Sequence, residues 1–146
     1  MAVRENSVFQ QLIGAWSLVS WRAVSPAGLI SHPYGEQPLG QIIYQPEGRM
    51  SACLMRRQRT RFVSENRLEA TPAERDAAYR DFLSYFGSFT VQEADSTVTH
   101  HVEGATFPNW SGTDLVRTFR FADGTLTLSL VRADGTVHEL VWARYH

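Results

Sequence analysis

Two predicted strands direct a basic side chain toward an apolar interior. In residues 98–102, valines at both ends share one face of the strand with His100, whereas His101 lies on the opposite face. In residues 115–121, Arg117 shares a face with a leucine and two phenylalanines. An inward guanidinium must be paired, hydrogen-bonded or bound to a ligand anion, and an imidazole, with an ordinary pKa of about 6.5, can transfer protons at neutral pH.

Each of these side chains has two interpretations. His100 is either a proton carrier or a core histidine satisfied by a backbone carbonyl. Arg117 either anchors a carboxylate, enolate or phenolate oxygen of a ligand or forms an internal ion pair with a buried acid. Strand alternation places no matching carboxylate inside, which favours a ligand. His138, in residues 137–144, is a third inward polar candidate, although the two faces of that strand are less distinct.

Several aromatic residues are candidates to line a pocket. A tyrosine hydroxyl can donate a hydrogen bond to a ligand oxygen, and the alternative for each ring is ordinary core packing. These candidates are Tyr34, Tyr44, Tyr79, Tyr85 and Trp110. Trp110 is at the centre of residues 106–112, a connection longer than its neighbours, so it is either a lid or a packed plug.

A series of short strands must position these residues. Two of the connections contain Asp-Gly, at 123–124 and 134–135, which is a strong hairpin signal. Short antiparallel strands at this spacing predict an all-β barrel or sandwich. The predicted strands cover residues 15–23, 39–44, 49–55, 89–92, 98–102, 115–121, 126–131 and 137–144.

One amphipathic helix is predicted between strands. Thr71-Pro72-Ala73-Glu74 supplies an N-cap, a proline at the first helical position and a glutamate three residues after the cap. Apolar residues follow at spacings of three and four from Ala78 to Phe86, and Gly87 ends the pattern. The pattern predicts a helix of about four turns that lies across one open end of a barrel. The arginine-rich segment 56–69 before it is predicted to be a loop.

Composition excludes several classes of chemistry. The chain has 146 residues, which suits a single domain over 1–146, and a formal net charge of −1, which argues against nucleic-acid binding. All 14 basic residues are arginine, so Schiff-base chemistry is excluded. Cys53 is the single cysteine and can form neither an internal disulfide nor a thiolate metal cage.

The sequence also lacks motifs for common cofactors. It has no Gly-rich dinucleotide fingerprint, no phosphate-binding loop and no Gly-x-Ser-x-Gly elbow, so no cofactor is predicted. No metal site is predicted, since His101 and Glu103 share a face that reads as solvent-exposed. No apolar run is long enough to span a membrane, and no signal peptide is visible. With the one cysteine, these features predict a cytoplasmic location.

The order of several motifs resembles the lipocalin-like domain proteins of bacteria and fungi. Gly-Ala-Trp at 14–16 resembles the opening strand of lipocalin-type barrels, and Leu-Val-Trp-Ala-Arg at 140–144 resembles the closing strand whose arginine lies against that tryptophan. The other matching pieces are Pro-Tyr-Gly at 33–35, Gly-Gln-Ile-Ile-Tyr at 40–44, Glu-Gly-Arg-Met-Ser at 47–51, Tyr-Phe-Gly-Ser-Phe at 85–89, His-His-Val-Glu-Gly at 100–104 and Phe-Pro-Asn-Trp-Ser-Gly at 107–112. The resemblance covers nearly the whole chain and implies a small β-barrel with an internal pocket.

The residues and the resemblance together predict an antiparallel, lipocalin-like β-barrel of eight or nine strands that encloses a small, largely apolar or aromatic molecule. Two classes of function follow. The first is a cofactor-free isomerase, cyclase or lyase acting on a metabolic intermediate, in which His100 moves a proton while Arg117 and a tyrosine stabilise an oxyanion. The second is a carrier or sequestering protein. A homodimer is compatible with the sequence, which does not define the oligomeric state.

Overall fold

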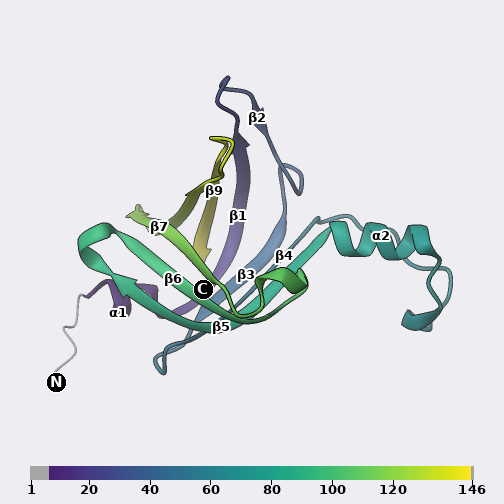
Figure 1. Ribbon diagram of the computed structural model, residues 1–146, viewed down its shortest axis with the longest axis horizontal. Coiled ribbons are helices and arrows are strands. Elements are labelled where there is room, and N and C mark those ends of the chain that lie inside the picture. Colours follow the sequence, from purple (N-terminus) through teal and green to yellow (C-terminus); the bar gives the residue numbers. More distant parts are fainter. Residues whose placement is uncertain (1–6, 146) are drawn as a thin grey trace.

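The first long strand of the protein pairs with the last. In the computed structural model, which describes residues 7–145, β1 (Gly14–Val24) is hydrogen-bonded to β9 (Val137–Arg144) on one side and to β3 (Leu39–Tyr44) on the other. The antiparallel order then runs from β3 to β9 through β4 (Arg49–Met55), β5 (Phe82–Gln92), β6 (Thr97–Ala105), β7 (Asp114–Ala122) and β8 (Thr125–Val131). These eight strands form a closed barrel, which confirms the predicted fold (Figure 1).

A ninth, two-residue strand, β2 (Ile30–Ser31), pairs with the end of β1. The hairpin between β7 and β8 has the geometry that Asp-Gly predicts, because Asp123 and Gly124 both adopt positive φ angles, 51° and 78°. Alternation along each strand then separates the two faces. In β4, for example, Met50, Ala52 and Leu54 are buried, whereas Ser51 between them is exposed.

The helix predicted between strands is present but shorter and differently placed. α2 (Pro72–Arg80) begins with the predicted capping box at Thr71, but β5 starts at Phe82, so Tyr85 and Phe86 belong to a strand. Without those aromatic rings the helix has little apolar surface, and none of its residues is buried. α2 therefore projects beyond the rim of the barrel, and the expectation that it lies across an open end does not hold (Figure 1).

A different helix closes one end of the barrel. α1 (Val8–Leu12), which the sequence patterns did not predict, buries Leu12 completely and stacks Phe9 on Phe89 with ring centroids 5.3 Å apart. The Trp16 indole donates to the Leu12 carbonyl, 2.9 Å away. The Arg144 guanidinium lies 4.2 Å from the centre of the Trp16 ring, which is the contact that the lipocalin resemblance implied.

The main core cluster includes Leu12 of α1. Tyr44, Met50, Phe89 and Leu126, on four different strands, belong to the same cluster and are all buried. Toward the other end of the barrel, the inward residues leave a cavity instead of filling the space. Within residues 7–145, no helix combines the length and the apolar character needed to cross a membrane.

Candidate functional site

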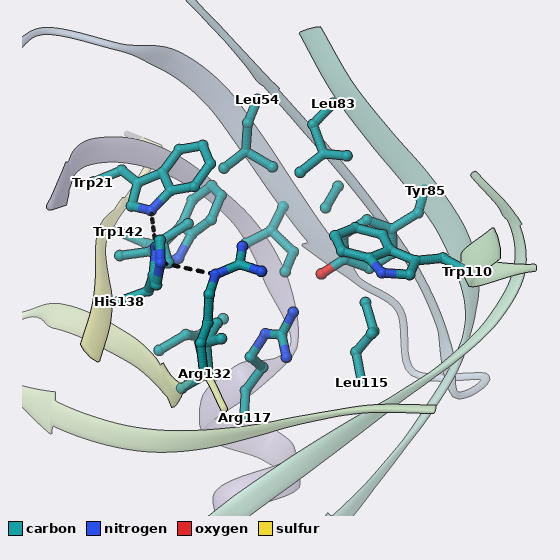
Figure 2. A pocket seen from close by; sticks show the side chains of 15 residues that line it. Trp21, Leu54, Leu83, Tyr85, Trp110, Leu115, Arg117, Arg132, His138 and Trp142 are labelled. Atoms are coloured by element: carbon teal, nitrogen blue, oxygen red, sulfur yellow. Dashed lines mark hydrogen bonds between the residues drawn. The ribbon is translucent and has the colours of Figure 1, made fainter. Parts of the chain in front are cut away.

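The barrel holds a mostly apolar cavity of about 200 Å³ at the end opposite α1. Aliphatic side chains and three tryptophans form most of its wall (Figure 2). Four polar residues interrupt this surface: Tyr85 on β5, Arg117 on β7, His138 on β9 and Arg132, which directly follows β8. A hollow of this composition can hold a small ligand and orient it through a few polar groups.

Arg117 is half-buried in the wall beside Leu115, one of the three residues with which alternation grouped it; Phe119 and Phe121 do not line the cavity. Its Nη1 donates to the backbone carbonyl of Val116, 3.2 Å away. No ion pair of the described residues includes Arg117 or Arg132, and no carboxylate lines the cavity. Burial lowers the pKa of Arg117, and the charge of Arg132 lowers it further. Because an arginine stays protonated in proteins, the cavity contains a positive charge without an internal counterion.

His100 lies behind the cavity wall and does not line the cavity. The side chain is completely buried, with its Nε2 2.7 Å from the Tyr44 hydroxyl and its Nδ1 2.9 Å from the Tyr85 hydroxyl. Burial, with a smaller contribution from the charge of Arg117, lowers the pKa of His100 to about 3. The imidazole is therefore neutral at physiological pH, with one nitrogen that donates and one that accepts.

The two tyrosines determine which nitrogen of His100 donates. Tyr44 is fully buried, and its hydroxyl has no other hydrogen-bond partner among the described residues, so its proton must point to Nε2 of His100. Nδ1 then carries the hydrogen and donates to the Tyr85 oxygen. This arrangement leaves the hydroxyl hydrogen of Tyr85 free for the cavity. Burial raises the pKa of Tyr85 to about 12, which keeps this hydrogen in place at neutral pH.

Two donors approach the His138 ring, one at each nitrogen. The Trp21 indole approaches Nδ1 at 3.0 Å, and Nε of Arg132 approaches Nε2 at 2.9 Å (Figure 2). Burial and the charges of Arg132 and Arg117 lower the pKa of His138, so this imidazole is also neutral and can accept at only one nitrogen. Trp21 is buried, and its indole has no other acceptor among residues 7–145. Arg132, which is exposed at the mouth of the cavity, is the donor able to change partners.

Trp142 contributes another unsatisfied donor. Its indole lines the cavity and is 1% exposed, and its Nε1 is the buried side-chain polar atom without a hydrogen-bond partner among the described residues. An orphaned buried donor is costly unless a ligand or water satisfies it.

The aromatic residues predicted to line a pocket are found in three places. Tyr85 and Trp110 line the cavity and meet edge to face, with centroids 5.7 Å apart. Tyr44 lies in the core beneath His100. Tyr34 and Tyr79 line a shallow hollow outside the cavity, and Leu83 and Trp110 belong to the walls of both spaces. Trp110 is therefore part of the partition between the cavity and its surroundings.

The sequence interpretation missed Arg132, Trp21 and Trp142 as cavity residues. A signal for Arg132 existed, because Leu126, Leu128, Leu130 and Arg132 follow one another at the spacing of a single strand face. On the outer surface, His101 binds Asp114 and Thr90, and Glu103 pairs with Arg49. Residues 7–145 contain no group of three or more candidate metal ligands.

Comparison with known proteins places this barrel in a family. The family described as lipocalin-like domain matches residues 13–145. The chain belongs to the lipocalin-like domain family. One relative, the 4'-hydroxy-3'-methoxypropiophenone carrier protein ppsC of Aspergillus oryzae (strain ATCC 42149 / RIB 40), is 37% identical over 98 residues, which cover 63% of this chain and 83% of the relative.

Two solved structures also align with this lipocalin-like domain. A redesigned beta barrel has a TM-score of 0.46 and 13% identity, with 94% of this chain and 95% of that chain covered. The wild-type fluorescent protein UnaG has a TM-score of 0.43 and 9% identity, with 94% and 100% covered.

Proposed function

We propose that this lipocalin-like domain is a carrier that binds a small, largely apolar or aromatic molecule in its barrel cavity. The observation that carries the proposal is the apolar cavity of about 200 Å³ with a few hydrogen-bond donors on its wall. The name of the fungal relative describes a carrier of a phenolic aryl ketone, which has this combination of an apolar ring and polar oxygens.

The size of the cavity restricts the ligand. An engineered apolar cavity of about 150 Å³ admits benzene, so a cavity of about 200 Å³ suits one aromatic ring with short substituents. Trp110 and the leucines of the wall would contact the ring, whereas Arg117 and the Tyr85 hydroxyl would hold a ligand oxygen.

The alternative function is a cofactor-free isomerase, cyclase or lyase in which His100 moves a proton. His100 would have to exchange that proton through Tyr85, because both of its nitrogens are engaged by Tyr44 and Tyr85 and it does not line the cavity. The pKa of His100, about 3, makes it a weak base, and the pKa of Tyr85, about 12, makes it a weak acid. We therefore favour the carrier. A cytoplasmic location and a homodimer stay predictions.

A bulky residue in the cavity tests the proposal. Ala52 on β4 lines the cavity, so Ala52→Phe places a ring where the ligand would lie, whereas Ser51→Phe places the same ring on the outer face of the strand. With 4'-hydroxy-3'-methoxypropiophenone as the probe, we expect quenching of tryptophan fluorescence in the wild type and in Ser51→Phe. Affinity in Ala52→Phe should fall at least about tenfold. Circular dichroism checks that each variant folds.

Three outcomes would contradict the carrier. The first is a folded Ala52→Phe variant that binds as tightly as the wild type, because the site would then lie outside the cavity. The second is a wild type that binds no aromatic probe. The third is conversion of the probe by the wild type but not by His100→Gln, detected by chromatography and mass spectrometry, which would favour the enzyme.

A further inference from the structure

The polar groups of the cavity wall offer more hydrogen-bond donors than acceptors. Arg117, Arg132, the Tyr85 hydroxyl and Nε1 of Trp142 all have donor capacity that the described residues do not fill. Among the described residues, the wall has two side-chain acceptors, the Tyr85 oxygen and one nitrogen of neutral His138. The Tyr85 oxygen already accepts from Nδ1 of His100, and Arg132 and the Trp21 indole compete for the single lone pair of His138. A ligand with several hydrogen-bond acceptors would pair with these donors.

The cavity wall also has more positively charged than negatively charged groups. Its described residues contribute two guanidinium groups and no carboxylate. Asp134 interacts electrostatically with Arg132, but it lies exposed in the turn between β8 and β9 and accepts a hydrogen bond from the Thr136 amide at 2.9 Å. No ion pair joins Asp134 to Arg132 among the described residues. Two positive charges therefore face the cavity at neutral pH.

We propose that the ligand of this cavity is an anion: a small aromatic molecule with an ionised oxygen group, a carboxylate or a phenolate, bound between Arg117, Arg132 and the Tyr85 hydroxyl. This inference rests on the proposed function, because it specifies the ligand of the same cavity. Ionised oxygens accept charge-assisted hydrogen bonds from guanidinium groups, which are stronger than bonds between neutral groups.

The spatial arrangement supports this orientation of the ligand. The guanidinium groups of Arg117 and Arg132 and the hydroxyl of Tyr85 converge on the same space, whereas Leu54 and Leu83 form an apolar part of the wall (Figure 2). A ring directed toward the leucines would place its ionised oxygen among the three donors. Folding has already removed much of the water around Arg117, so binding an anion there adds little desolvation cost on the protein side.

Arg132 has a second role in this arrangement. Its exposed position at the mouth lets it contact an anion before the ligand reaches Arg117. On binding, Arg132 can give up its contact with Nε2 of His138, which leaves Nδ1 of that ring to accept from Trp21. We therefore expect the loss of Arg117 to weaken binding more than the loss of Arg132.

Matched anionic and neutral probes of similar size test the inference. The first pair is 3-phenylpropanoate and 3-phenylpropanamide, and the second is 4-nitrophenolate and 4-nitroanisole, measured by calorimetry at mildly alkaline pH. We expect each anion to bind the wild type at least about tenfold more tightly than its neutral partner. Arg117→Gln should reduce that preference to about threefold or less, and Arg132→Gln should reduce it by a smaller factor. The control is Arg120→Gln, on the outer face of β7, which should keep the wild-type preference.

The outcomes separate this inference from the proposed function. Equal binding of anions and neutral partners would overturn the anion inference and leave the aromatic carrier standing. No binding of any probe would overturn both. An anion preference that survives Arg117→Gln together with Arg132→Gln would place the anion elsewhere and also overturn the inference. A preference within one pair alone would identify the ionised group as a carboxylate or a phenolate.

Discussion

The buried imidazole of His100 should make the stability of the barrel depend on pH. Its pKa is about 3 in the folded protein, because burial disfavours the charged form, and about 6.5 in an unfolded chain. The folded pKa is depressed, so the unfolded state binds more protons between these two values. The neutral ring therefore contributes its full stability above about pH 6.5, and this contribution is lost as the pH falls toward 3.

The magnitude follows from the two pKa values. One pH unit between them corresponds to about 1.4 kcal/mol for a group that takes up one proton on unfolding. Between about pH 7.5 and pH 5, the loss of unfolding free energy from His100 alone is about 2 kcal/mol. Other titrating groups add to the total, including His138, whose pKa is also lowered, so the contribution must be isolated by a variant.

His100→Gln removes the titration, and His101→Gln, on the outward face of the same strand, is the matched control. Urea unfolding of all three proteins at about pH 7.5, 6 and 5 gives the free energy of unfolding at each pH. We expect the wild type and His101→Gln to lose about 2 kcal/mol more than His100→Gln between the highest and lowest pH. Parallel pH dependence of the wild type and a folded His100→Gln variant would refute the reasoning. If His100→Gln does not fold, nitrogen chemical shifts of the histidine-labelled wild type replace this comparison. They must show that His100 is neutral at about pH 5, with its hydrogen on Nδ1.

Three further changes test the packing of the barrel. Tyr44→Phe removes the donor to Nε2 of His100 and should lower the free energy of unfolding by about 1–3 kcal/mol, whereas exposed Tyr79→Phe should have little effect, both measured in urea. Gly87→Ala places a Cβ in steric overlap with the backbone carbonyl oxygen of His101 on β6, so we expect a destabilisation of about 1–3 kcal/mol or more, or no folded protein by circular dichroism. Arg144→Met removes the cation over the indole at the closed end and its bonds to two carbonyls, and should cost about 1–2 kcal/mol in thermal unfolding. An unchanged melting temperature would show that this contact contributes no net stability.

The sequence by itself determined the features that depend on local spacing. Alternation with a period of two placed His100 and Arg117 inside and His101 outside, and the Asp-Gly pairs located the last two hairpins. The capping box located the start of α2 correctly. The aromatic residues from Phe82 to Phe86 were assigned to the wrong element, because spacings of three and four over a few residues also occur in a strand with aromatic residues on both faces.

The tertiary structure alone decided which inward side chains meet. Tyr44, Tyr85 and His100 come from β3, β5 and β6, and only the register of these strands places both hydroxyls on one imidazole. Closure of the barrel also brings Arg132 to the cavity that Arg117 lines, and it leaves that cavity unfilled by side chains. The physical reason is that a local pattern determines the face of a sheet that a residue occupies, whereas its neighbours across a barrel depend on strand order, register and the volume of residues far away in the chain.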